Sequence, residues 1–196
     1  TIATSDLDTS ATTDPDTTAT TDCTEDACTS GPGSTSGVPT GDPGDLSHCF
    51  LPFVDGVGGL AQDSRELPAL GTIEDLHVLV RVSHESVGDL QITIEHGGTT
   101  RTLLDHPLDG ACDRNQVDAT FDDDADASAD ESCLEEGSAI AGAVLPTEPL
   151  AAFLGMESEG EWTLRVMDEI DPNDPVPLVQ DSWCLVILTD GPLVLE

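Results

Sequence analysis

Apolar and polar residues alternate in three separate segments of the chain. A period of two is the pattern of a strand that buries one face and exposes the other. The segments and their apolar positions are 74–84 (Leu76, Val78, Val80 and Val82), 88–96 (Leu90, Ile92 and Ile94) and 160–168 (Trp162, Leu164 and Val166). We predict that each segment is a strand whose apolar face packs on a common core.

The neighbouring sequence extends this all-β pattern. Gly97-Gly98 joins the second segment to TTRTLL (99–104), which predicts a β-hairpin with a two-residue turn. The segment SWCLVILT (182–189) is apolar at both alternating sets of positions, so it predicts a central strand covered on both faces. Only PLAAFLG (149–155) favours a helix, and a short one. The elements together predict an antiparallel, jelly-roll-like β-sandwich.

The beginning of the chain differs in composition from the rest. Residues 1–46 are rich in Thr, Ser, Asp, Gly and Pro and hold almost no large apolar side chain. Such a segment cannot bury enough surface to offset the entropy of ordering it. We therefore expect a disordered, acidic stalk over 1–46 and one folded domain over 47–194, with Trp162 and Trp183 as anchors between its sheets.

The chain is strongly acidic. It has 40 Asp and Glu against five Arg and no Lys, which gives a formal net charge of −35. Such a surface repels nucleic acid and anionic membranes, and it suits basic partners, divalent cations or a salty medium. No run of 18 apolar residues exists, so we expect no transmembrane segment. The chain starts at Thr1 without a visible signal peptide, as a mature form or a fragment would.

Six cysteines without a Cys-x-x-Cys pair favour disulfides in an exported protein over a zinc site. Six cysteines allow about fifteen pairings, among which we expect Cys23–Cys28, Cys112–Cys133 and Cys49–Cys184. The first pair would close a small local loop, and the second brackets an acidic loop. The third would join the first strand to the last, which are often neighbours in sandwiches.

Residues 78–104 (VLVRVSHESVGDLQITIEHGGTTRTLL) resemble the hallmark segment of the P-domain, or P/Homo B domain, of kexin- and furin-like proprotein convertases and secreted bacterial proteases. The shared pattern is an alternating strand, Ser-His, a turn, Gly-Asp-Leu, a second alternating strand and a third that ends in Leu. Later motifs follow in family order. They are the Phe-Asp-Asp loop in 117–128, the Leu-x-x-Phe-x-Gly and Gly-x-Trp-x-Leu-x-Val-x-Asp motifs in 146–168, and a Trp-bearing last strand in 178–187.

The resemblance implies a sandwich of about eight strands with no chemistry of its own. In convertases the domain packs on a subtilisin-like catalytic domain, stabilises it and tunes its response to calcium and pH. Bacterial members also occur away from a protease, where a binding role is supposed. The implied partner is thus a protein, with a protease catalytic domain as one candidate.

Acidic clusters at predicted strand ends are candidate ligands for Ca²⁺, which takes six to eight oxygen atoms. The clusters are Asp89; Asp122, Asp123 and Asp124; and Asp168, Asp171 and Asp174. Asp89 opens one strand and Asp168 closes another, so antiparallel pairing would place them at the same end of the sandwich. The resemblance points the same way, because some family members bind calcium in such loops. The alternative for Asp89 is a residue that accepts backbone N–H bonds in its own turn.

His84, Asp89 and His96 flank one strand and raise the question of catalysis. A hydrolytic triad needs a nucleophile, a base and an orienting acid within hydrogen-bond reach. No recognisable motif places a nucleophilic Ser here, so we expect no catalytic residue. We expect His84 and Gly88 to fix the turn between their strands.

Two functions fit these observations. The first is a non-catalytic, secreted or cell-surface module on a stalk, with lipid or stalk anchoring upstream of Thr1. The second is the P-domain of a subtilisin-like serine protease, whose proteolysis would belong to the full-length protein. A hydrolase in its own right would need turnover that depends on His84 or Asp89.

Overall fold

The computed structural model describes residues 45–50, 59–168 and 179–190, which belong to a compact unit beginning at Gly41. All but the last two residues of the expected stalk lie outside these ranges. The strands are β1 (Asp45–Phe50), β2 (Leu60–Leu67), β3 (Ile73–Ser83), β4 (Leu90–His96), β5 (Thr99–Asp105), β6 (Val117–Phe121), β7 (Ile140–Val144), β8 (Gly160–Asp168) and β9 (Val179–Thr189). Two 3₁₀ turns, η1 (Val87–Asp89) and η2 (Leu150–Phe153), are the helical segments of the described part, and neither has the length and apolar character needed to span a membrane.

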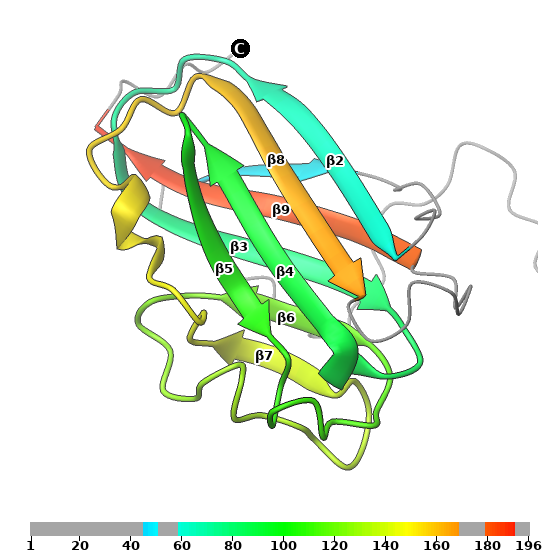
Figure 1. Cartoon of the computed structure of the whole chain (residues 1–196). Helices are drawn as coiled ribbons and strands as arrows, with labels where there is room; N and C mark the ends of the chain where they lie inside the picture. Colours follow the sequence, from blue (N-terminus) through cyan, green and yellow to red (C-terminus); the bar gives the residue numbers. More distant parts are fainter. Residues whose placement is uncertain (1–44, 51–58, 169–178, 191–196) are drawn as a thin grey trace, which may run out of the picture. The chain divides into compact units, whose positions relative to one another are not determined.

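The strands form two sheets that pack face to face, so the all-β sandwich is confirmed (Figure 1). The five-stranded sheet has the order β1-β9-β3-β6-β7, and the four-stranded sheet has the order β2-β8-β4-β5. Every pairing is antiparallel except that of β6 with β7, which is parallel. Strands β1 and β9 are therefore neighbours although they come from the two ends of the domain.

The alternating residues supply the core, as the sequence predicts. The inward apolar side chains of β3, β4 and β8 are all at most 2 % exposed, and Trp162 and Trp183 are buried between the sheets. Strand β9 is central, but the four-stranded sheet covers only the face that carries Leu185 and Ile187. On the other face Val186 is only 8 % exposed, so the prediction of two covered faces holds at this residue, while Cys184 and Leu188 are half-buried.

The two local predictions hold with small differences. Gly97 and Gly98 form the two-residue turn between β4 and β5, with φ of 56° and 79°, a combination that suits glycine. The short helix expected over 149–155 is a single 3₁₀ turn. Asp123 caps this turn, because its two carboxylate oxygens accept hydrogen bonds from the backbone N–H groups of Leu150 (2.9 Å) and Ala151 (2.7 Å).

Two of the three expected disulfides are confirmed. Cys49 in β1 is bonded to Cys184 in β9, and Cys112 to Cys133 across the β5–β6 and β6–β7 loops. The pair Cys23–Cys28 lies outside the described residues.

Candidate functional site

His84 and Asp168 meet at the end of the sandwich where β3 and β8 finish. Leu90 pairs with Asp168, so Asp89 and Asp168 do lie at the same end, as predicted. His84 Nε2 is 3.4 Å from Asp168 Oδ2, an ion-pair distance, and the two side chains are 2 % and 7 % exposed. His84 Nδ1 lies 2.7 Å from the carbonyl oxygen of Ser86, to which it donates. His84 therefore ties the turn before η1 to β8, the structural role that the sequence predicts.

Gly88 shapes the same turn through close packing. Its N–H donates to the carbonyl oxygen of Cys112 at 2.9 Å. A Cβ atom at this position would lie 2.8 Å from the backbone oxygen of Gly110 and 2.9 Å from the backbone nitrogen of Cys112. Only a residue without a side chain lets η1 approach the loop that Cys112 anchors.

The acidic residues after β6 lie far from this end. Asp122 Oδ2 is 3.8 Å from His77 Nδ1, and seven residues of β3 separate His77 from His84, roughly 23 Å at about 3.3 Å per residue. Asp122 Oδ1 also accepts a hydrogen bond from the backbone N–H of Asp124 at 2.8 Å, and Asp123 caps η2. These carboxylates stabilise their own turns, and they cannot share an ion with Asp168.

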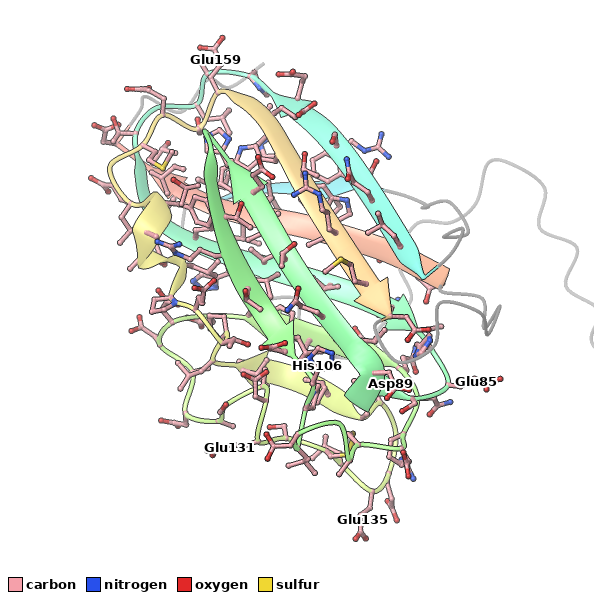
Figure 2. The ribbon with its side chains drawn as sticks, viewed as in Figure 1. Glu85, Asp89, His106, Glu131, Glu135 and Glu159 are labelled. Carbon is pink, nitrogen blue, oxygen red and sulfur yellow. A yellow bond between two sulfur atoms is a disulfide. The ribbon has the colours of Figure 1, made fainter. Side chains whose placement is uncertain are left out.

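The described residues do not by themselves make a calcium site. No three His, Cys, Asp or Glu side chains come together as potential ligands within the described part of the chain. Asp89 is half-buried in η1, at the end of the domain where Figure 2 also shows Glu85. Asp171 and Asp174 lie outside the described residues, so calcium binding stays a prediction.

His96 is a packing residue at the other end of β4. Its ring stacks on Trp162, with centroids 4.0 Å apart and planes 1° from parallel. Its Nδ1 and Nε2 lie 3.0 and 2.8 Å from the carbonyl oxygens of Glu161 and Glu157. His96 and Asp89 stand at opposite ends of β4, so the three residues that raised the question of catalysis do not form one site.

The outer face of the four-stranded sheet is mostly polar, with Leu60 and Met167 as an apolar pair at one end. Arg165 of β8 donates to the Gln62 side chain at 2.9 Å and to the Glu95 carboxylate. The hydroxyl groups of Ser64 and Thr163 are 2.8 Å apart. A surface of polar side chains that hydrogen-bond to one another is typical of a sheet face in contact with water.

The outer face of the five-stranded sheet is different. The strand register aligns one outward residue from each strand in a row, and none of the five is charged. Ser47 and Leu188, with Val186 between them at only 8 % exposed, extend the uncharged surface along β1 and β9. We call these eight residues the neutral strip: Ser47, Cys49, Leu79, Thr120, Ala143, Cys184, Val186 and Leu188.

Acidic side chains border the neutral strip. On one side lie Asp75 and Asp122, with His77 between them (3.0 and 3.8 Å). On the other side Arg81 pairs with Asp118 at 2.9 Å, and both side chains are about half exposed (52 % and 45 %). No prediction from the sequence points to this surface. The signal was present, because residues 182–189 carry apolar side chains on both faces.

Two comparisons with known proteins found matches to this chain. The model of the "Proprotein convertase P-domain" family matches residues 73–187, more than half of the chain. Two solved structures are similar to this chain, each at 16 % sequence identity. One is the serine protease of Aeromonas sobria (TM-score 0.45, 74 % of this chain, 27 % of that chain), and the other is the complex of that protease and the chaperone (TM-score 0.46, 75 % and 27 %).

This chain thus spans about 27 % of the length of the protease chains that it matches. No curated protein matches it. The order of the motifs, the sandwich and the family match agree, and the chain belongs to the proprotein convertase P-domain family.

Proposed function

We propose that this P-domain is a non-catalytic, exported accessory module that docks on a protein partner through the neutral strip. The observation that carries the proposal is the contrast between the two outer faces. The outer face of the four-stranded sheet carries hydrogen-bonded polar side chains. The outer face of the five-stranded sheet has an uncharged centre, in a chain with 40 acidic residues. An apolar surface patch with a polar rim is typical of an interaction site.

The charges of the domain indicate the chemistry of the partner. Asp75, Asp118 and Asp122 at the rim favour a partner surface with an apolar centre and basic residues around it. A net charge of −35 steers such a partner and repels a second copy of this chain. Each outward residue covers about 4.8 Å between strands by about 6.6 Å along its strand, so the eight residues cover roughly 250 Å², about a third of what one side of a stable interface buries. The rim must therefore contribute to binding.

Two settings fit this role. In the first, the domain stands on a stalk at the cell surface and binds a separate protein. In the second, it is part of a longer serine protease and docks on the catalytic domain of that protein. The family supports the second setting, since it takes its name from the proprotein convertases. A lipid-attachment Cys upstream of Thr1 would favour the first.

Photo-crosslinking from each outer face tests the docking proposal. A photoreactive residue at Ala143, exposed in the neutral strip, is compared with one at Thr100, exposed in β5 of the other sheet. We expect a crosslink to one protein from position 143 alone. With that protein purified, Thr120→Asp should weaken binding and Thr102→Asp should not. Crosslinking from position 100 alone, or a binding affinity that Thr120→Asp does not change, would place the docking surface elsewhere.

Calcium binding is a separate part of this proposal. The ligands would be Asp89 and Asp168, which share one end of the domain, together with Asp171 and Asp174. A ligand at a hundredfold excess over its Kd stabilises the folded state by about 2.7 kcal/mol. The thermal midpoint should therefore rise by several degrees in Ca²⁺ relative to EDTA at constant ionic strength, and Asp89→Asn should remove the rise. An equal midpoint in both buffers would end the calcium proposal.

A further inference from the structure

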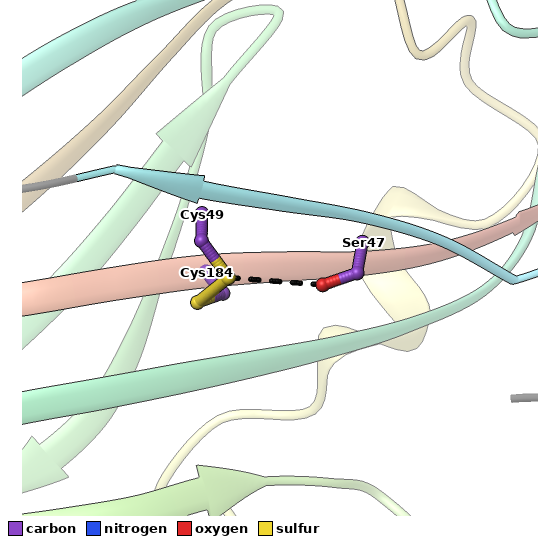
Figure 3. The surroundings of a disulfide bond; sticks show 3 residues. All are labelled: Ser47, Cys49 and Cys184. Atoms are coloured by element: carbon purple, nitrogen blue, oxygen red, sulfur yellow. Dashed lines mark hydrogen bonds between the residues drawn. A yellow bond between two sulfur atoms is a disulfide. The ribbon is translucent and has the colours of Figure 1, made fainter. Parts of the chain in front are cut away.

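The two described disulfides differ in exposure. Cys49–Cys184 (Figure 3) lies on the outer face of the five-stranded sheet, where Cys49 is exposed and Cys184 half-buried. In the other bond Cys112 is 0 % exposed, and its half-buried partner Cys133 packs against the core. A reducing thiolate has to reach a sulfur atom in order to attack it. A thiolate can reach Cys49–Cys184 in the folded protein. It can reach Cys112–Cys133 only at the sulfur of Cys133, which packs against the core.

Strand β1 depends on this exposed bond. It is a six-residue edge strand, and β9 is its one strand neighbour in the described part of the chain. Two of its inward residues are half-buried: Phe50, whose ring lies 4.7 Å from that of Trp183, and His48. Burial lowers the pKa of His48, and no described atom accepts or donates a hydrogen bond at its Nε2. His48 and Phe50 therefore hold β1 less firmly than fully buried side chains would.

Strand β9 does not depend on the bond. On its other side it pairs with β3 from Val179 to Thr189, and it buries Trp183, Leu185 and Ile187 in the core. Opening the bond would leave β9 in place and remove the covalent tie of β1 alone.

From these observations we propose that Cys49–Cys184 is a reducible latch. A dithiol opens it before Cys112–Cys133, and its opening frees β1 from β9 while the other strands stay folded. One thiolate of the dithiol attacks a sulfur of the protein bond, and a mixed disulfide forms as the other cysteine leaves as a thiolate and takes up a proton. The second thiol of the reagent then closes its own disulfide, so the reagent is oxidised and Cys49 and Cys184 become thiols.

Ser47 favours this opening. Its Oγ is 3.7 Å from Cys49 Sγ (Figure 3), within reach for the hydroxyl to donate to the sulfur. When Cys49 leaves as a thiolate, a hydrogen bond from Ser47 stabilises the developing charge. Released β1 exposes the edge of β9 and removes Ser47 and Cys49 from the neutral strip.

Timed reduction of the folded, full chain with dithiothreitol, followed by alkylation and mass spectrometry, tests the latch. Since the chain has no Lys, trypsin cuts only after its five Arg residues. Cys184 then lies in the peptide 166–196 and Cys133 in 115–165, so each reports one disulfide without ambiguity. We expect Cys184 to be alkylated at least about ten times faster than Cys133. Equal rates, or faster labelling of Cys133, would overturn the proposal.

Hydrogen exchange on the selectively reduced chain tests the release of the strand. Amides of 45–50 should exchange faster than in the oxidised chain, while those of β3 and β6 should not change. Unchanged exchange in β1 would show that the bond is not a latch.

Two sets of variants complete the test. Ser47→Ala should slow the reduction by about threefold, whereas Ser182→Ala, an outward serine on β9, should not. The double variant Cys49→Ser/Cys184→Ser should show the fast exchange of β1 without any reductant. If the amides of β1 in that variant were as protected from exchange as in the oxidised wild type, the proposal would be contradicted. This holds even if Cys49–Cys184 were reduced before Cys112–Cys133.

Discussion

At the scale of single residues, Asp63 shows how an inward-facing charge is accommodated at the edge of the sandwich. Its side chain is 13 % exposed and lies on edge strand β2. Asp63 Oδ2 accepts hydrogen bonds from Trp183 Nε1 at 2.9 Å and from Arg65 Nε at 2.8 Å. An inward charge on an edge strand also discourages pairing with another chain.

Asp63→Ala is predicted to destabilise the domain. The change leaves the buried Trp183 N–H without its acceptor and Arg65 without its carboxylate, which should lower the free energy of unfolding by about 2–3 kcal/mol. Urea unfolding followed by Trp fluorescence measures the loss. Asp63→Asn keeps an oxygen acceptor and should cost less; equal costs for both variants would argue against the hydrogen bonds as the cause.

Gly88→Ala is predicted to destabilise the domain through steric overlap. The added methyl group would meet backbone atoms of Gly110 and Cys112 below 3.0 Å, and backbone cannot move aside as a flexible side chain can. Overpacking of this kind costs about 1–3 kcal/mol. The thermal midpoint should fall by several degrees. An unchanged midpoint would mean that the loop of Cys112 shifts freely.

At the scale of elements, β1 is predicted to lose stability on acidification. Burial lowers the pKa of His48 below its ordinary value of 6.5 in the folded state, so the unfolded state binds its proton first as the pH falls. The contribution of His48 to stability is therefore neutral above about pH 6.5 and becomes unfavourable as the pH falls from there toward the lowered pKa. The measurement is urea unfolding between pH 8 and pH 5. His48→Gln should reduce the pH dependence in this window, and an identical slope in both proteins would exclude His48 as its source.

The element scale also shows where sequence prediction succeeds. The alternating segments became β3, β4 and β8, because the two-residue period of a strand is a local property of the chain. The turn at Gly97-Gly98 formed for an equally local reason, since glycine tolerates positive φ. The second apolar face of β9 is covered at Val186 but only in part at Cys184 and Leu188, and the pattern of one strand does not show how far its faces are covered.

At the scale of the whole molecule, the net charge of −35 is predicted to make stability depend on salt. Carboxylates repel one another in the compact state, and added salt screens this repulsion, with a Debye length of about 10 Å at 0.1 M and about 3 Å at 1 M. The thermal midpoint should rise as NaCl is increased from about 0.05 M to about 1 M, the range in which screening changes most. Scanning calorimetry without Ca²⁺ measures the effect. A flat midpoint would mean that local pairs already compensate the acidic residues.

The candidate sites were less predictable than the fold. The same-end placement of Asp89 and Asp168 followed from antiparallel order alone. Asp122 and Asp123, by contrast, lie elsewhere and cap turns. Their placement depends on the position of β6 beside β3 and on the location of η2. The neutral strip combines residues from five strands, and no sequence window contains them together.

The sequence by itself determined the alternating strands β3, β4 and β8, the hairpin and the tryptophan anchors, and it indicated the two described disulfide pairs. Periodicity and turn residues act locally, and a large apolar Trp side chain favours the core. Only the tertiary structure decided which outward residues share a face, which acidic clusters are apart and which disulfide is exposed. These properties depend on the order and register of strands that are distant in sequence, and that order results from the packing of the whole core.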